Sequence, residues 1–384
     1  MPTVPVKPEL IRWARDRAGL TVAALVERFP RYERWESGEG LPTLHQLEEL
    51  AKATHAPLGY FFLPEPPTER LPVPDFRTVQ DRPVRRPSPD LIETIQIMQR
   101  RQSWLRDHLL EEEQPPLPFV GSATVQENPE AVAARVRQQL GLAPDWARHY
   151  PTWTEALRGL RQASEAAGVV VTINGVVGNS TRRKLDPEEF RGFVLSDPHA
   201  PVVFVNGSDA KAAQMFTLVH ELAHLWLGQG GVFSLPGMQP ADYAAEIWCN
   251  RLAAEFLVPA SELSALWPAA DVTAEPFQFL ARRFKVSPLV TARRALDLRL
   301  IGREGFLSFY RHYLEDDRRQ AARRSPGGDF YLTQEVRIGR RFGEAVVRAA
   351  KEGRLLFTEA YRLTGLYGAT FDQYAEALSG RPRP

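Results

Sequence analysis

The sequence contains a single cysteine, Cys249, among its 384 residues. One thiol cannot form an internal disulfide or a metal cluster built on several cysteines, so any bound metal must be held by histidine and carboxylate side chains. So low a cysteine content is typical of proteins from reducing compartments. We therefore expect a cytoplasmic protein.

Long hydrophobic runs and an excess of one charge are also missing. No apolar stretch approaches the roughly 18 residues that a transmembrane helix requires, and residues 1–7 lack the pattern of a secretory signal. The formal net charge of +1 provides no general attraction to nucleic acid or to an anionic membrane. We expect no membrane partner, and nothing in the sequence indicates an oligomeric state.

The rest of the chain reads as a mixture of helices and a few strands. Helical spacing of apolar residues marks 8–63, and closely spaced prolines at 64–89 predict a linker. Strands are expected at 169–173, 190–195 and 201–205, where β-branched and aromatic residues are frequent. Further elements expected from the same patterns are helices at 90–113, 129–140, 153–167, 209–227, 241–257, 276–301 and 339–351, with a loop at 228–240. The predicted fold class is therefore α+β.

The segment His220-Glu221-Leu222-Ala223-His224 carries the clearest chemical signal. At about 100° per residue, His220 and His224 lie about 40° apart and one turn along the same helix face, so both imidazoles can bind one ion. Glu221 lies beside that face, where its carboxylate can take a proton from a metal-bound water. The pattern predicts a zinc site with Glu221 as general base, although manganese stays an alternative.

Such a site needs a third protein ligand. Carboxylates on the next predicted helix are the candidates, namely Asp242, Glu246 and Glu255. Nine residues separate Glu246 from Glu255, so these two point to opposite helix faces. Glu246 has apolar neighbours in the sequence, where a carboxylate needs a compensating cation. These arguments favour Glu246 without excluding the other two.

These motifs resemble the ImmA/IrrE family of metallopeptidases. The resemblance rests on Phe216 to His224, on Glu246-Ile-Trp-Cys-Asn250, on Ala253 to Pro259 and on the preceding strand segment Val203-Phe-Val-Asn206. It implies that Glu246 is the third ligand of the metal. It also implies a zincin domain with a thermolysin-like core, in which a small sheet packs on the two ligand-bearing helices.

The long members of that family begin with an Xre-type helix-turn-helix, and residues 12–51 resemble that domain. The expected organisation is a helix-turn-helix-like domain at 1–66, a Pro-rich linker and helix at 67–125, a zincin peptidase domain at 126–301 and a small C-terminal unit at 302–384. The first of these looks degenerate, because the stretch from Thr21 to Glu36 is shorter than the usual pattern by about four residues at the recognition helix.

DNA binding is left open by the sequence. Residues 1–66 carry eight basic and nine acidic residues, a net charge of −1, which favours a docking or dimerisation module over a DNA reader. Residues 276–299 show a helix-turn-helix pattern, and they contain six basic residues and one acidic residue. They either contact DNA or only complete the peptidase domain, and the second interpretation is slightly favoured.

Other polar residues near the motif were weighed as auxiliary groups. His199 and Tyr243 are candidates to stabilise a developing oxyanion, although ordinary structural roles are favoured. Asn206 is a candidate to bind a substrate backbone or to form a turn. Cys249 is expected to be a buried, inert thiol.

The resulting functional hypothesis is a zinc-dependent endopeptidase acting inside the cell. The family resemblance implies a protein substrate, such as a helix-turn-helix repressor or an antitoxin, in a stress, mobile-element or defence response. Two alternatives from other classes stay open: a DNA-binding transcriptional regulator with a vestigial site, and a toxin–antitoxin component that acts by binding its partner.

Overall fold

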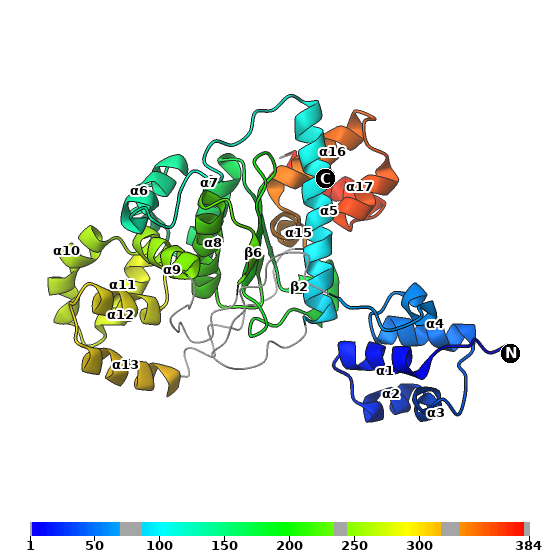
Figure 1. The fold of residues 1–384 in the computed structure, drawn as a ribbon. Coiled ribbons are helices and arrows are strands. Elements are labelled where there is room, and N and C mark those ends of the chain that lie inside the picture. Colours follow the sequence, from blue (N-terminus) through cyan, green and yellow to red (C-terminus); the bar gives the residue numbers. More distant parts are fainter. Residues whose placement is uncertain (1, 70–86, 234–243, 316–329, 380–384) are drawn as a thin grey trace. The chain divides into compact units, whose positions relative to one another are not determined.

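The computed structural model describes residues 2–69, 87–233, 244–315 and 330–379, and it combines many helices with two small sheets (Figure 1). The described residues form two compact units, one ending at Gln96 and the other beginning at Ile97. The α+β fold class is confirmed by this mixture of elements. No helix in the described ranges is long and apolar enough to cross a lipid bilayer.

The first unit is built from short helices around its own core. Its elements are α1 (Pro8–Arg17), α2 (Val22–Arg28), α3 (Tyr32–Ser37), α4 (Leu44–Ala53), the 3-10 helix η1 (Leu58–Phe62) and the start of α5 (Pro89–Glu111). Thr21 caps α2, and Thr43 forms a capping box with Gln46 at the start of α4, so both helices begin where local hydrogen bonding favours it. The rings of Tyr32 and Trp35 are buried beside Leu10 in this core.

The second unit contains a four-stranded sheet in the order β1-β5-β4-β6. The strands are β1 (Val170–Asn174), β4 (Gly192–Leu195), β5 (Val202–Asn206) and β6 (Gly231–Phe233). β1 and β5 run parallel, whereas β4 is antiparallel to both β5 and β6. β6 lies within the stretch 228–240 that was expected to be a loop, so that expectation was wrong for its first part. A separate antiparallel pair is formed by β2 (Val176–Val177) and β3 (Ser180–Lys184).

Helices pack against this sheet and extend away from it (Figure 1). They are α6 (Pro129–Gln139), η2 (Trp146–His149), α7 (Trp153–Ala166), α8 (Lys211–Trp226), α9 (Ala244–Leu257), α10 (Ala260–Asp271), α11 (Pro276–Phe284), α12 (Pro288–Asp297), α13 (Arg303–Glu315), α15 (Phe330–Ile338), α16 (Arg340–Lys351), α17 (Phe357–Thr364) and α18 (Ala369–Leu378). Val203 and Val205 of β5 share one apolar core with Leu218 and Leu222 of α8. Cross-strand stacking of Phe193 on Phe204, with ring centroids 4.9 Å apart, strengthens the β4–β5 pairing.

A stretch between α5 and α6 closes the C-terminal end of α8. The backbone N–H groups of Gly121 and Ala123 donate to the carbonyl oxygens of Leu225 and Trp226, at 2.9 Å and 2.8 Å. The ring of Phe119 stacks on that of Trp226 with centroids 4.5 Å apart. The last carbonyls of a helix have no partner within the helix, so this strap satisfies two of them.

Candidate metal centre

The predicted motif lies in the last two turns of α8, and every side chain from Gln214 to Trp226 is buried. The helix ends at Trp226, and Gly228, just after the C-cap residue, takes the left-handed conformation (φ +66°) that glycine adopts readily. On the opposite side, α9 presents Glu246, of which 4% is exposed. The helix pair α8–α9 therefore brings His220, His224 and Glu246 together inside the protein.

The three side chains converge on one point. The Nε2 atoms of His220 and His224 are 3.1 Å apart, and they lie 3.2 Å and 3.1 Å from the two carboxylate oxygens of Glu246. Ligand atoms placed about 2.0–2.1 Å from a tetrahedral zinc ion lie roughly 3.3–3.4 Å from one another. The observed spacing fits a metal ion of this kind, and among the described residues this is the group that can hold one.

The protonation of these groups also suits a metal. Burial lowers the pKa of His220, and Glu246 only partly opposes this effect. Burial opposes ionisation of Glu246, but its polar contacts with His220 and His224 outweigh it and lower the pKa of that carboxyl. At neutral pH His220 is therefore neutral and Glu246 is charged, which are the forms that coordinate a cation.

Asn250, one turn after Glu246 on α9, supports His220 from behind. Its Oδ1 lies 3.1 Å from His220 Nδ1, and because an amide oxygen can only accept, the ring nitrogen donates. This tautomer leaves the lone pair of Nε2 directed at the cluster. The sequence analysis gave Asn250 no role, although its spacing of four residues from Glu246 was a usable signal.

Glu221 lies beside the cluster and is fully buried. Neither of its oxygens has a hydrogen-bond partner among the described residues. Burial raises the pKa of Glu221 well above its ordinary value, and the neighbouring charge of Glu246 adds to the shift. A carboxylate in this setting has an increased affinity for a proton, which is the property a general base requires.

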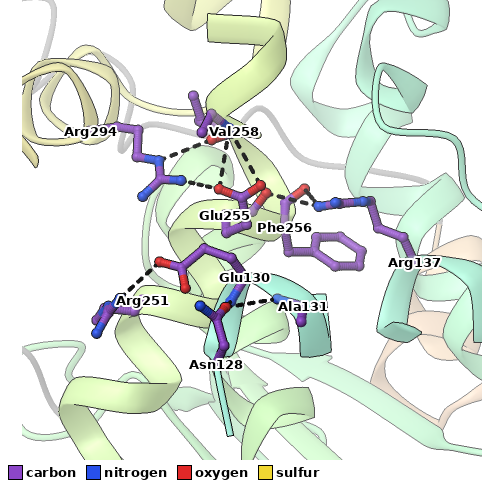
Figure 2. A network of polar contacts seen from close by, with 10 residues as sticks. Asn128, Glu130, Ala131, Arg137, Arg251, Glu255, Phe256, Val258 and Arg294 are labelled. Carbon is purple, nitrogen blue, oxygen red and sulfur yellow. Dashed lines mark hydrogen bonds and ion pairs between the residues drawn. The ribbon is translucent and has the colours of Figure 1, made fainter. Parts of the chain in front are cut away.

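The structure distinguishes Glu255 from Glu246 as a candidate ligand. Glu255, near the other end of α9, forms an ion pair with Arg294 of α12, as Figure 2 shows. It also accepts hydrogen bonds from the backbone N–H of Ala260. Arg137 of α6 closes the same network by donating to the Glu255 carbonyl oxygen at 2.8 Å. Glu255 is thus already neutralised by an arginine and is not part of the metal-type cluster, which was one of the alternatives left open. Asp242 and Tyr243 lie outside the described residues.

The remaining auxiliary candidates lie in turns or in the core and are not part of the cluster. Asn206 accepts a hydrogen bond from the backbone N–H of Ser208 and donates to the Phe190 carbonyl oxygen, so its side chain organises the turn after β5. Cys249 is fully buried, and burial raises the pKa of its thiol well above the ordinary value. His199 lies in the turn between β4 and β5 and is not one of the cluster residues.

Comparison with known protein families matches two segments of the chain. Residues 165–296 match the family described as the IrrE N-terminal-like domain (Peptidase_M78), a segment that includes all four residues of the predicted site. Residues 338–377, which span α16 to α18, match a domain of unknown function, DUF8813. No curated protein matches the chain. The helix-turn-helix part of the resemblance stays a prediction. Residues 165–296 are therefore a metallopeptidase domain of the ImmA/IrrE family, and the buried His–His–Glu cluster within it is a group that can hold the metal cofactor.

Proposed function

We propose that this protein is a zinc-dependent endopeptidase that acts on a protein substrate inside the cell. The observation that carries the proposal is the convergence of two imidazole nitrogens and one carboxylate within 3.2 Å of one another, with a second carboxylate buried alongside. Zinc, when bound, supplies a Lewis acid that makes water a nucleophile near neutral pH.

The residues of the chain would divide the work as follows. His220, His224 and Glu246 hold the ion, and Asn250 keeps His220 in the tautomer that binds it. The carboxylate of Glu221 accepts a proton from the attacking water and returns it to the leaving amine. Two imidazoles with one carboxylate favour zinc over manganese, which prefers oxygen ligands.

We propose a helix-turn-helix repressor or an antitoxin as the substrate, on the strength of the family resemblance. The first unit would then dock a protein rather than read DNA. Supporting this, α3 has six residues, and its Tyr32 and Trp35 are buried in the core of the unit, so few side chains are left on it for contacts with bases. The net charge of −1 over residues 1–66 agrees with a docking role.

The basic segment 276–299 offers little support for the DNA-binding alternative. Arg294 is buried against Glu255, and Lys285 is buried and donates to the Arg282 carbonyl oxygen. Arg293 pairs with Asp297 on its own helix. Three of the six basic residues thus have partners within the domain, which favours an architectural role for α11 and α12.

A proteomic comparison tests the proposed function. The wild type and Glu221→Gln are expressed in a host strain that lacks the native copy, and the proteome is searched for new protein termini. We expect a regulator that is shortened only in the wild-type strain and that the purified zinc-loaded protein cleaves. DNA binding that survives both zinc removal and Glu221→Gln, without cleavage, would instead support a regulator. Stable co-purification with one partner, unchanged by Glu221→Gln and without cleavage, would support a toxin–antitoxin role.

A further inference from the structure

Within the described part of the protein, packing contacts rather than hydrogen bonds position the carboxylate of Glu221. Its side chain is fully buried, yet neither oxygen has a hydrogen-bond partner in the described part of the chain. A flexible side chain with three rotatable bonds adopts one position under these conditions only if its surroundings exclude the others. The atoms that pack against it therefore determine where this carboxylate lies.

Gly192, the first residue of β4, provides one of those surfaces. A Cβ atom at this position would lie 2.6 Å from Thr217 Cγ2, 2.8 Å from the Phe204 carbonyl oxygen and 3.0 Å from Glu221 Oε1. Contacts to a Cβ atom below 3.0 Å are essentially never found, and a contact at 3.0 Å is tight, so one or more of these groups would have to move. Gly192 is not among the glycines with a positive φ, so its backbone does not require glycine, and the space does.

The neighbours of Gly192 have little freedom to retreat. Strand β4 is paired on both sides at this position, with Val205 of β5 and Phe233 of β6. Thr217 and Glu221 are four residues apart on α8 and face the strand together. A side chain at 192 would therefore push on the helix face that carries Glu221.

We propose that Gly192 is a positioning residue, and that its missing side chain forms the notch in which the Glu221 carboxylate is seated beside the metal ligands. The catalytic part of this inference rests on the proposed peptidase function, whereas the contact itself does not. Displacing a general base by about 1 Å costs on the order of 100-fold in rate. The 3.0 Å contact displaces Glu221 by only a few tenths of an ångström, so Gly192→Ala should lower kcat by less than this, about 10-fold, and leave KM and zinc affinity unchanged.

A double-mutant cycle on the metal-free protein tests the contact without any measurement of activity. Gly192→Ala is introduced into the wild type and into Glu221→Ala, and urea unfolding midpoints are compared. We expect the loss caused by Gly192→Ala to be clearly smaller when the carboxylate is absent, because coupled neighbours give non-additive effects. Gly159→Ala on α7, where a Cβ would meet Tyr150 instead, should cause the same loss in both backgrounds.

Strict additivity in the Gly192 cycle would overturn the inference. If Gly192→Ala does not fold, the cycle is repeated in a Thr217→Ser background, which removes the shortest predicted contact and leaves the one to Glu221. In that background kcat separates the two proposals. If adding Gly192→Ala leaves the kcat of the Thr217→Ser protein unchanged while adding Glu221→Gln abolishes turnover, the positioning role fails and the peptidase proposal stands. If the wild type cleaves nothing, the peptidase fails, and the cycle still decides the contact.

Discussion

The two ends of helix α9 place acidic side chains in similar burial but in opposite electrostatic surroundings. Glu246 at the N-terminal end is 4% exposed and Glu255 at the C-terminal end is 8% exposed. Glu255 faces the guanidinium of Arg294 and a backbone N–H group at the start of α10. Glu246 faces two imidazoles, and burial lowers the pKa of one of them, His220.

The comparison distinguishes a structural acid from a proposed metal ligand. A buried carboxylate needs compensating charge, and at Glu255 the chain itself supplies it. At Glu246 the facing groups are two imidazoles rather than an arginine, so a bound cation would supply the missing positive charge. Burial alone did not distinguish the two residues, whereas the partner on the facing helix did.

The largest effect is expected from Glu246→Gln, which keeps the size of the side chain and removes its charge. Loss of a supporting hydrogen bond lowers metal affinity by about 10–100-fold, so loss of a direct ligand should cost more than about 100-fold. Zinc affinity is measured by competition with a chelator, and peptidase turnover should fall with it. Glu255→Gln is the matched control on the same helix and should keep its zinc. Equal affinities in the two variants would contradict the distinction.

The converse change is Arg294→Met, which should destabilise the fold without affecting the metal. Leaving one member of a buried ion pair without its partner costs about 3–5 kcal/mol in the free energy of unfolding. The side chain of Arg294 is 6% exposed, and its pair with Glu255 joins α9 to α12. Arg293→Met offers a neighbouring control, because that side chain is 41% exposed and its pair with Asp297 lies at the surface. That control should change stability by less than about 1 kcal/mol. Similar losses in both variants would argue against the buried pair.

A smaller effect is expected from Asn250→Ala. Without the Oδ1 acceptor, His220 is free to adopt the tautomer that turns a proton toward the cluster, so zinc affinity should fall by about 10–100-fold. Asn250→Asp keeps an acceptor at this position and should retain most of the affinity. The same chelator competition measures both, and an unchanged affinity in Asn250→Ala would remove the supporting role.

The smallest effect is expected in the first unit, where Glu36, like Glu255, is neutralised by an arginine. Glu36 accepts hydrogen bonds from Arg15 at 2.8 Å and 3.0 Å. Arg15 lowers the pKa of the Glu36 carboxyl against the opposing effect of burial. A lowered pKa means that the stabilisation is present above the ordinary value near 4.5 and is lost as the pH falls through the lowered one. Glu36→Gln should therefore weaken this unit at pH 7 by less than about 2 kcal/mol, and by progressively less below pH 4. Hydrogen exchange of α3 peptides, compared between wild type and variant at each pH, measures this, and a difference that grows in acid would contradict it.

The part of the site that follows helical periodicity was predictable from the sequence. The spacing of His220 and His224 and the opposite facing of Glu246 and Glu255 depend only on helix geometry, and the structure places these side chains as that geometry requires. Most long helices and the three apolar strands were predictable for the same reason, because each carries a repeating apolar pattern over several residues.

Other features leave no local pattern to detect. Strand β6 has three residues and owes its conformation to backbone pairing with β4, which is distant in the sequence. Helix α10 contains Pro268, and α13 has no buried residue, so neither shows the usual signal of a packed helix. The notch at Gly192 exists because glycine has no side chain, and the sequence does not show which residues pack against that position in the fold. The expected unit boundaries at 66, 125 and 301 stay predictions.

The strap at Gly121 and Ala123 limits how this protein can be shortened or recombined. A fragment that starts at 126 would lack the two N–H donors to Leu225 and Trp226 and the ring stacked on Trp226, just past the histidine pair. Gene fusions or exchanges of modules that keep these contacts must therefore join the chain upstream of Phe119.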